Sequence, residues 1–113
     1  MGKLNGQVAI ITGGARGIGE GICKVFCNEG AMVALWDIMD EGQNTADRIK
    51  DEGGEIIFQN VNVSDQSSVD KAVEKLISEY GKIDILINNA GIIRDRSFLK
   101  MSRDEWDQVI DVN

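Results

Sequence analysis

A glycine-rich turn between an apolar strand and a helix constrains the fold of this chain more than any other feature. Residues 7–12 (QVAIIT) form a short, β-rich apolar run of the kind found in strands buried on both faces. Glycines follow at positions 13, 14, 17 and 19. Apolar residues then recur at helical spacing over 17–29, at Ile18, Ile22, Val25 and Phe26. The pattern predicts a strand, a tight turn and a helix that buries this apolar stripe.

The rest of the chain repeats the alternation. Buried strands are predicted over 31–36, 55–63 and 83–87, and helices over 40–52 and over the segment that ends at Gly81. This last helix has the most regular apolar stripe and is expected to be capped by Ser64 or Asp65. Its stripe consists of Val69, Ala72, Val73, Leu76, Ile77 and Tyr80. Alternating strands and helices predict an α/β fold, a Rossmann-type doubly wound parallel sheet.

The C-terminal segment predicts one more helix. Ser102 and Glu105 form a capping box, and Trp106, Val109, Ile110 and Asn113 share one helical face. No glycine stop follows, and a sheet that finished with the strand at 83–87 would leave that strand as an exposed edge. We therefore expect residues 1–113 to be the first half of a longer domain and to hold its first four strands.

Composition narrows the possible functions. The 113 residues contain no histidine, which excludes Ser-His-Asp and Cys-His catalysis within the chain, and no metal site is expected. A net charge of −7 argues against nucleic acid and anionic membranes as partners, and no apolar run approaches the roughly 20 residues of a membrane helix. Cys23 and Cys27 are interpreted as small core residues of a helix. Without a secretory signal pattern, a cytoplasmic location is expected.

Residues 13–19 form a candidate phosphate loop. The amino end of a helix favours anions, and the spacing G-x3-G-x-G assigns Gly13 to the turn, Gly17 to close ligand approach and Gly19 to tight helix–strand packing. No Lys-Ser/Thr pair follows, so a P-loop NTPase is disfavoured. The alternative is a tight turn without a ligand. The other loop residues expected to contact a dinucleotide are Gly14, Ala15, Arg16 and Ile18.

Asp37 follows the strand predicted at 31–36, eighteen residues after Gly19. A carboxylate there can accept both hydroxyls of the adenosine ribose and would repel a 2′-phosphate, so Asp37, with Ile38 beside it, favours NAD over NADP. Arg16 has the opposite effect, because a guanidinium can pair with a 2′-phosphate. Asp37 decides the prediction, because a carboxylate against a dianion is costly. The alternative role for Asp37 is an exposed acid that caps the next helix.

These residues together resemble the short-chain dehydrogenase/reductase family over essentially the whole chain. Residues 12–19 fit its T-G-x-x-x-G-x-G loop, and residues 88–91 fit its N-N-A-G signature. Asn62 and Val63 match the pair that usually lines the adenine pocket, and Asn113 matches the helical asparagine of the catalytic set.

The resemblance implies an NAD(P)-dependent oxidoreductase that interconverts a secondary alcohol and a ketone. It places Asn89, Ala90 and Gly91 beside the nicotinamide-side ribose. It also implies that Asn113 holds a water molecule that relays protons to the active-site lysine. Segments 89–95 and 99–101, with Trp106, most resemble 3-oxoacyl-(acyl-carrier-protein) and acetoacetyl-CoA reductases, which implies a small-molecule or acyl-thioester substrate and a homodimer or homotetramer. Many of those reductases prefer NADPH and lack an acid at the position of Asp37, so NADP stays an alternative.

The family's catalytic serine and Tyr-x-x-x-Lys pair have no match in this sequence. The one tyrosine, Tyr80, belongs to an apolar stripe and is followed by Lys82, with no lysine at position 84. Tyr80 is therefore predicted to be a core residue, and the 113 residues alone are predicted to lack hydride transfer. The alternative function is a truncated nucleotide- or partner-binding module without catalysis.

Overall fold

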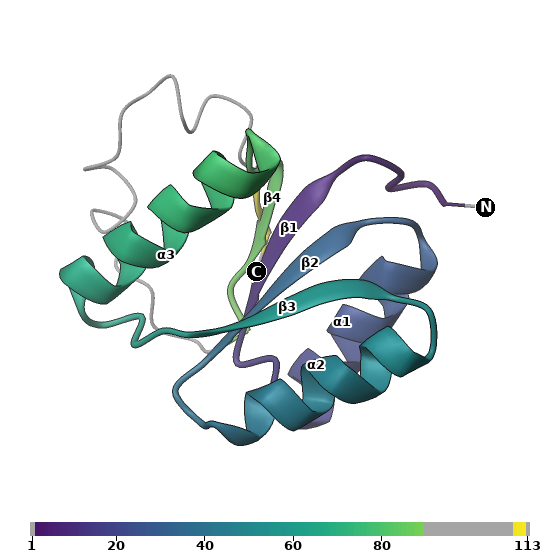
Figure 1. Ribbon diagram of the computed structural model, residues 1–113, viewed down its shortest axis with the longest axis horizontal. Coiled ribbons are helices and arrows are strands. Elements are labelled where there is room, and N and C mark those ends of the chain that lie inside the picture. The colour runs from purple at the N-terminus through teal and green to yellow at the C-terminus, as the bar shows by residue number, and fades with distance from the viewer. Residues whose placement is uncertain (1, 90–109, 113) are drawn as a thin grey trace.

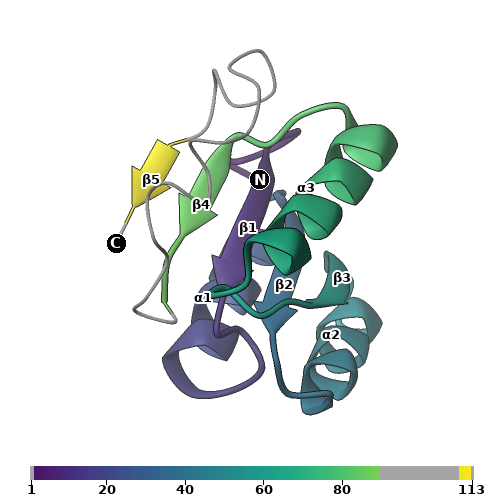
Figure 2. The same ribbon diagram turned by 90° about the vertical axis from the view of Figure 1, so that its left-hand side faces the viewer.

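A computed structural model describes residues 2–89 and 110–112, and within them five parallel strands form one sheet (Figure 2). The order across the sheet is β3-β2-β1-β4-β5, and every pairing is parallel. The strands are β1 (Val8–Thr12), β2 (Met32–Asp37), β3 (Glu55–Asn60), β4 (Ile85–Ile87) and β5 (Ile110–Val112). This order, with helical crossovers, confirms the predicted Rossmann-type α/β fold.

Three helices cover the two faces of the sheet (Figure 1). Helices α1 (Gly17–Asn28) and α2 (Glu41–Asp51) lie on one face, and α3 (Gln66–Tyr80) lies on the other. None of the helices in the described part of the chain is long and apolar enough to cross a membrane. The arrangement leaves the carboxyl ends of β1, β2 and β3 at one edge of the sheet.

The core follows from the two-residue period of the strands, because successive side chains of a strand point to opposite faces. Val8 and Ile10 of β1 pack with the α3 side, whereas Ile11 packs with the α1 and α2 side. In β2 the alternation is complete: Met32, Ala34 and Trp36 face α3, and Val33 and Leu35 face the other helices. The central strands are therefore buried on both faces, as their continuous apolar runs predict.

Helix α3 begins and ends where the sequence signals predict. The side chain of Asp65 accepts a hydrogen bond from the Ser67 N–H at 3.1 Å, and Gly81 ends the helix with a φ of 82°. The predicted stripe faces the core, with Val69, Ala72, Val73 and Leu76 buried and Tyr80 partly buried. Tyr80 is thus a core-packing residue, as predicted, and burial raises the pKa of its hydroxyl.

The predicted apolar stripe of α1 is wrong in part. Ile18 and Val25 are 78% and 58% exposed, while Cys23 is buried. The cause is Gly19, which lets α1 approach the sheet so closely that the line from Gly19 to Cys23 becomes its inner face. Cys23 and the half-buried Cys27 are core residues, as predicted, and burial raises their thiol pKa values to about 12 and about 11. The described residues contain no cluster of potential metal ligands.

The C-terminal helix prediction is also wrong over its last turn. Ile110–Val112 forms β5, which pairs with Ile85–Ile87 of β4. A strand with two β-branched residues can use the free hydrogen-bonding groups of β4, and this tertiary pairing outweighs a helical periodicity read from the sequence. β4 is therefore not an exposed edge, and five strands are present where four were predicted. Trp106, Val109 and Asn113 lie outside the described residues.

Candidate functional site

A pocket of about 300 Å³ opens at the carboxyl edge of the sheet. Five of its lining residues were predicted as cofactor contacts: Gly13, Asp37, Ile38, Asn62 and Val63. Three others, Trp36, Val61 and Ser64, also line the pocket, and the sequence did not indicate them because they belong to no recognised motif. The pocket is formed where β1 and β2 end and where the chain leaves β3, a position at which open α/β sheets bind their ligands.

The glycine loop turns tightly at the end of β1. The N–H groups of Gly13 and Gly14 both donate to the carbonyl of Trp36, at 2.8 and 3.3 Å. Gly13 has a φ of 66°, which a residue with a side chain rarely adopts. A Cβ on Gly19 would lie 1.9 Å from the Gly13 oxygen, so only glycine permits this contact between helix and loop.

The amino end of α1 has no side-chain cap. Arg16 occupies the N-cap position in an extended conformation, and no side chain accepts a hydrogen bond there. The first amide groups of a helix have no partner within the helix, and they carry the positive end of its dipole. The exposed Ile18 lies in this first turn. The start of α1 therefore offers N–H donors and partial positive charge to an anion.

Asp37 is held in place by two backbone N–H groups. Its Oδ2 accepts from Ala15 N at 3.1 Å and its Oδ1 accepts from Met39 N at 3.0 Å. No ion pair in the described part of the chain reaches this half-buried carboxylate. Because an ionised carboxylate has about four acceptor positions, Asp37 retains capacity for two more donors, such as a pair of vicinal hydroxyls.

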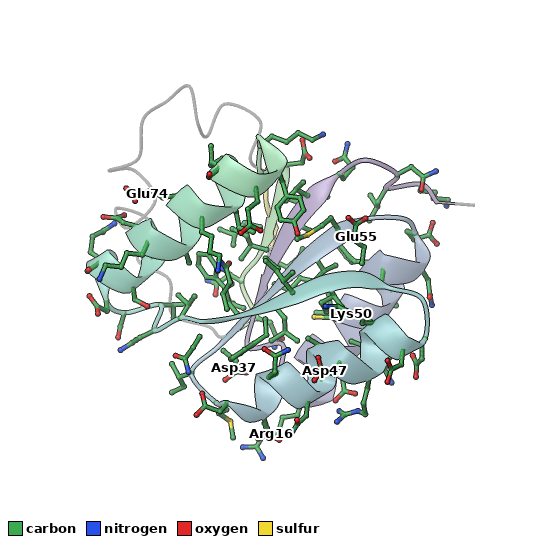
Figure 3. All side chains as sticks on the ribbon, in the orientation of Figure 1. Arg16, Asp37, Asp47, Lys50, Glu55 and Glu74 are labelled. Carbon is green, nitrogen blue, oxygen red and sulfur yellow. The ribbon has the colours of Figure 1, made fainter. Side chains whose placement is uncertain are left out.

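Arg16 lies at the same edge of the molecule as Asp37 (Figure 3). Its guanidinium does not contact Asp37. It lies 3.7 Å from a carboxylate oxygen of Glu41 and 3.3 Å from the sulfur of Met39. The side chain is 68% exposed, so it is a surface cation beside the loop.

Side-chain hydrogen bonds behind the pocket brace the loop and the pocket wall. The Thr45 hydroxyl of α2 donates to the Ala15 carbonyl of the loop. Trp36 Nε1 donates to Gln59 at 2.7 Å, and Gln59 donates in turn to the Ala72 carbonyl of α3 at 3.1 Å. These contacts join residues far apart in the sequence, and no sequence motif indicated them.

The two asparagines of the N-N-A-G signature tie β4 to the end of β1. Thr12 Oγ1 lies 3.3 Å from Asn88 Oδ1, and Asn89 Nδ2 donates to the Gly13 carbonyl at 3.2 Å. Asn89 is thereby placed against the turn of the glycine loop. Ala90, Gly91 and Asn113 lie outside the described residues. Asn62, the predicted adenine neighbour, accepts hydrogen bonds from the Ser64 N–H and hydroxyl through its side-chain oxygen.

Comparison with known protein families identifies the family to which this chain belongs. A family model described as short chain dehydrogenase matches residues 7–113. The chain belongs to the short-chain dehydrogenase family. This is a family of NAD(P)-linked oxidoreductases, and the glycine loop, Asp37 and the pocket lie within the matched residues of this short-chain dehydrogenase chain.

The relatives of this chain are named for different substrates. The chain is 46% identical over 112 residues to a 3-oxoacyl-(acyl-carrier-protein) reductase of Chlamydia muridarum, covering 97% of this chain and 45% of the reductase. A hydroxysteroid dehydrogenase from Escherichia coli superposes with a TM-score of 0.71 at 35% identity, over 75% of this chain and 36% of that one. A putative D-mannonate oxidoreductase from Haemophilus influenza with bound NAD gives 0.75 at 25% identity, over 84% and 34%. This short-chain dehydrogenase chain spans less than half the length of the curated relatives it matches.

Proposed function

We propose that this chain supplies the dinucleotide site of an NAD-linked oxidoreductase that interconverts a secondary alcohol and a ketone. The observation that carries the proposal is Asp37, fixed by two amides beside the glycine loop with acceptor capacity left over. The cofactor supplies the hydride, and this chain's residues bind and orient it. The residues fit such a ligand, because the uncapped start of α1 suits a pyrophosphate and the 300 Å³ pocket suits an adenosine.

The proposal assigns each predicted residue a part. Residues 13–19 hold the pyrophosphate, Asp37 and Ile38 hold the adenosine ribose, and Asn62 and Val63 line the adenine site. Asn89, Ala90 and Gly91 contact the nicotinamide-side ribose, and Asn113 takes part in the proton relay. No metal is required. Because neither a matching serine nor Tyr-x-x-x-Lys lies within the 113 residues, we propose that these residues alone do not transfer hydride.

The substrate class rests on resemblance. The reductase relative supports a 3-hydroxyacyl/3-oxoacyl pair, carried as an acyl thioester, over other ketones. We also propose a homo-oligomeric enzyme in the cytoplasm, without a nucleic-acid or membrane partner. The rival function, a partner-binding module without catalysis, loses one of its supports because β5 occupies the free side of β4.

Cofactor binding is the direct test. Calorimetric titration of the natural protein that carries this sequence is expected to give a lower Kd for NADH than for NADPH. Heat from neither coenzyme would overturn the proposed function. The intact mass of the natural protein separates enzyme from module, because a mass near 12.4 kDa favours the module and about twice that favours the enzyme.

The preference for NAD has its own test in Asp37→Ala. A hydrogen bond to a charged group contributes about 1.5–3 kcal/mol, so the NADP(H)/NAD(H) ratio of kcat/KM is expected to rise about tenfold or more. Asp47→Ala removes an exposed carboxylate on α2 that accepts a hydrogen bond from Gln43 of the same helix, and it is expected to leave the ratio unchanged (Figure 3). An unchanged ratio in Asp37→Ala would overturn the proposed role of that residue.

A further inference from the structure

A glutamate outside the pocket forms an ion pair with the one cation of the glycine loop. Glu41 is the first residue of α2, and its Oε1 lies 3.7 Å from Nη1 of Arg16. The other terminal nitrogen of Arg16 contacts Met39 Sδ at 3.3 Å. Glu41 and Met39 thus draw the guanidinium toward the start of α2.

The neighbouring acids have contacts other than Arg16. Asp40 accepts a hydrogen bond from the Asn60 side chain at 2.9 Å, and Asp37 accepts from two backbone amides. Glu20 pairs with Lys24 and Arg48. Within the described residues, Glu41 is therefore the carboxylate that ion-pairs with Arg16.

The position of Arg16 matters because Arg16 is the only basic residue in the glycine loop, residues 13–19. A guanidinium recognises a phosphate with parallel N–H donors, and a 2′-phosphate on the adenosine ribose would need that partner to offset the charge of Asp37. To serve NADP, Arg16 must give up its ion pair with Glu41. NAD makes no such demand.

We infer that Glu41 is a second determinant of cofactor preference, which favours NAD by holding Arg16 away from a 2′-phosphate. The inference rests on the proposed function, and it assigns a positioning role, since Glu41 acts through Arg16. An exposed ion pair contributes little free energy, so loss of Glu41 strengthens NADPH binding by about 1.5- to fivefold. This expected change in NADPH affinity is smaller than the change expected for Asp37→Ala, so the two roles can be told apart.

The test is Glu41→Gln in the natural protein, with Kd for NADPH and NADH measured by titration at low salt. The expected result is a Kd for NADPH about 1.5 to five times lower, an unchanged Kd for NADH, and loss of the difference in 0.5–1 M salt. Glu52→Gln is the matched control, because it removes the same charge just beyond the opposite end of the same helix. In an Arg16→Ala background, Glu41→Gln is expected to change neither Kd.

The outcomes are separable. If the wild-type protein binds NADH but Glu41→Gln leaves the Kd for NADPH unchanged, this inference is overturned and the proposed function stands. A gain in NADPH affinity that persists in the Arg16→Ala background would also overturn it, because Glu41 would then act by direct repulsion. Binding of neither coenzyme by the wild type would overturn both the inference and the proposed function.

Discussion

Two aspartates at opposite edges of the sheet have different surroundings. Asp37, at the carboxyl edge, accepts two backbone N–H groups and has no ion pair within the described chain. Asp84, at the amino edge, is 5% exposed. Its Oδ2 accepts from Val8 N at 2.8 Å and lies 3.0 Å from the ammonium of Lys82, while its own N–H donates to the Val8 carbonyl.

The difference separates a structural carboxylate from one with capacity for a ligand. At the amino edge the chain provides both hydrogen-bond donors and a counter-charge for Asp84, so nothing further is needed there. At the carboxyl edge the chain fixes the position of Asp37 but leaves acceptor sites open, beside a helix start with no cap. An oriented polar group whose bonding is incomplete indicates a binding site better than its residue type does.

The largest expected effect lies at the amino edge. Asp84→Ala removes the acceptor of the buried Val8 N–H, and a buried donor left without an acceptor costs about 2 kcal/mol of unfolding free energy. The ion pair adds little to this cost, because the Lys82 side chain is 46% exposed. Urea unfolding of the natural protein measures it. Asp84→Asn keeps an acceptor oxygen and is expected to lose less.

If Asp84 has only a structural role, Asp84→Ala is expected to leave the preference between NADH and NADPH unchanged. The NADPH/NADH ratio of Kd values in the folded variant is the readout. A shift in that ratio as large as the one expected for Asp37→Ala would mean that the two edges are not functionally distinct.

A smaller effect is expected from a methyl group added at the carboxyl edge. Gly19→Ala places a Cβ 1.9 Å from the Gly13 oxygen and 2.8 Å from Asn89 Nδ2, so the helix start must shift away from the loop. Misplacement of the donors is expected to raise the Kd for NADH about tenfold, which is about 1.4 kcal/mol. Titration measures the change.

Gly21→Ala is the matched control for Gly19→Ala. It adds the same methyl group to the same helix, where nothing lies within 4 Å, and it is expected to stabilise the protein by about 0.5–1 kcal/mol without changing Kd. Equal loss of affinity in both variants would contradict the assignment of close packing to Gly19.

Local signals in the sequence predicted the parts of the fold that depend on neighbouring residues. The cap at Asp65, the stop at Gly81 and the turn at Gly13 each need only a few adjacent residues, and the structure has all three. The buried strands were predictable for a similar reason, since a continuous β-rich apolar run carries its own signal.

Features that depend on distant partners were not predictable from the sequence. The inner face of α1 is set by the contact of Gly19 with Gly13, which exposes Ile18. The pairing of β5 with β4 and the link from Trp36 through Gln59 to Ala72 need the tertiary fold to be known first. The sequence likewise showed Arg16 and Asp37 as competing charges, and only the structure shows that Arg16 forms an ion pair with Glu41.

The smallest expected effect is at the start of α3, which we compare with the start of α1. Asp65 caps α3 through the Ser67 N–H, whereas α1 begins at Arg16 without a side-chain cap. Asp65→Ala is expected to cost about 1 kcal/mol of unfolding free energy, because the Ser67 N–H loses its acceptor, and to leave the Kd for NADH unchanged. Asp65→Asn retains a capping oxygen and should lie near wild type in a urea titration. If Asp65→Ala weakened NADH binding as much as Gly19→Ala, the capped start of α3 would belong to the binding site, and the distinction between closed and open helix starts would fail.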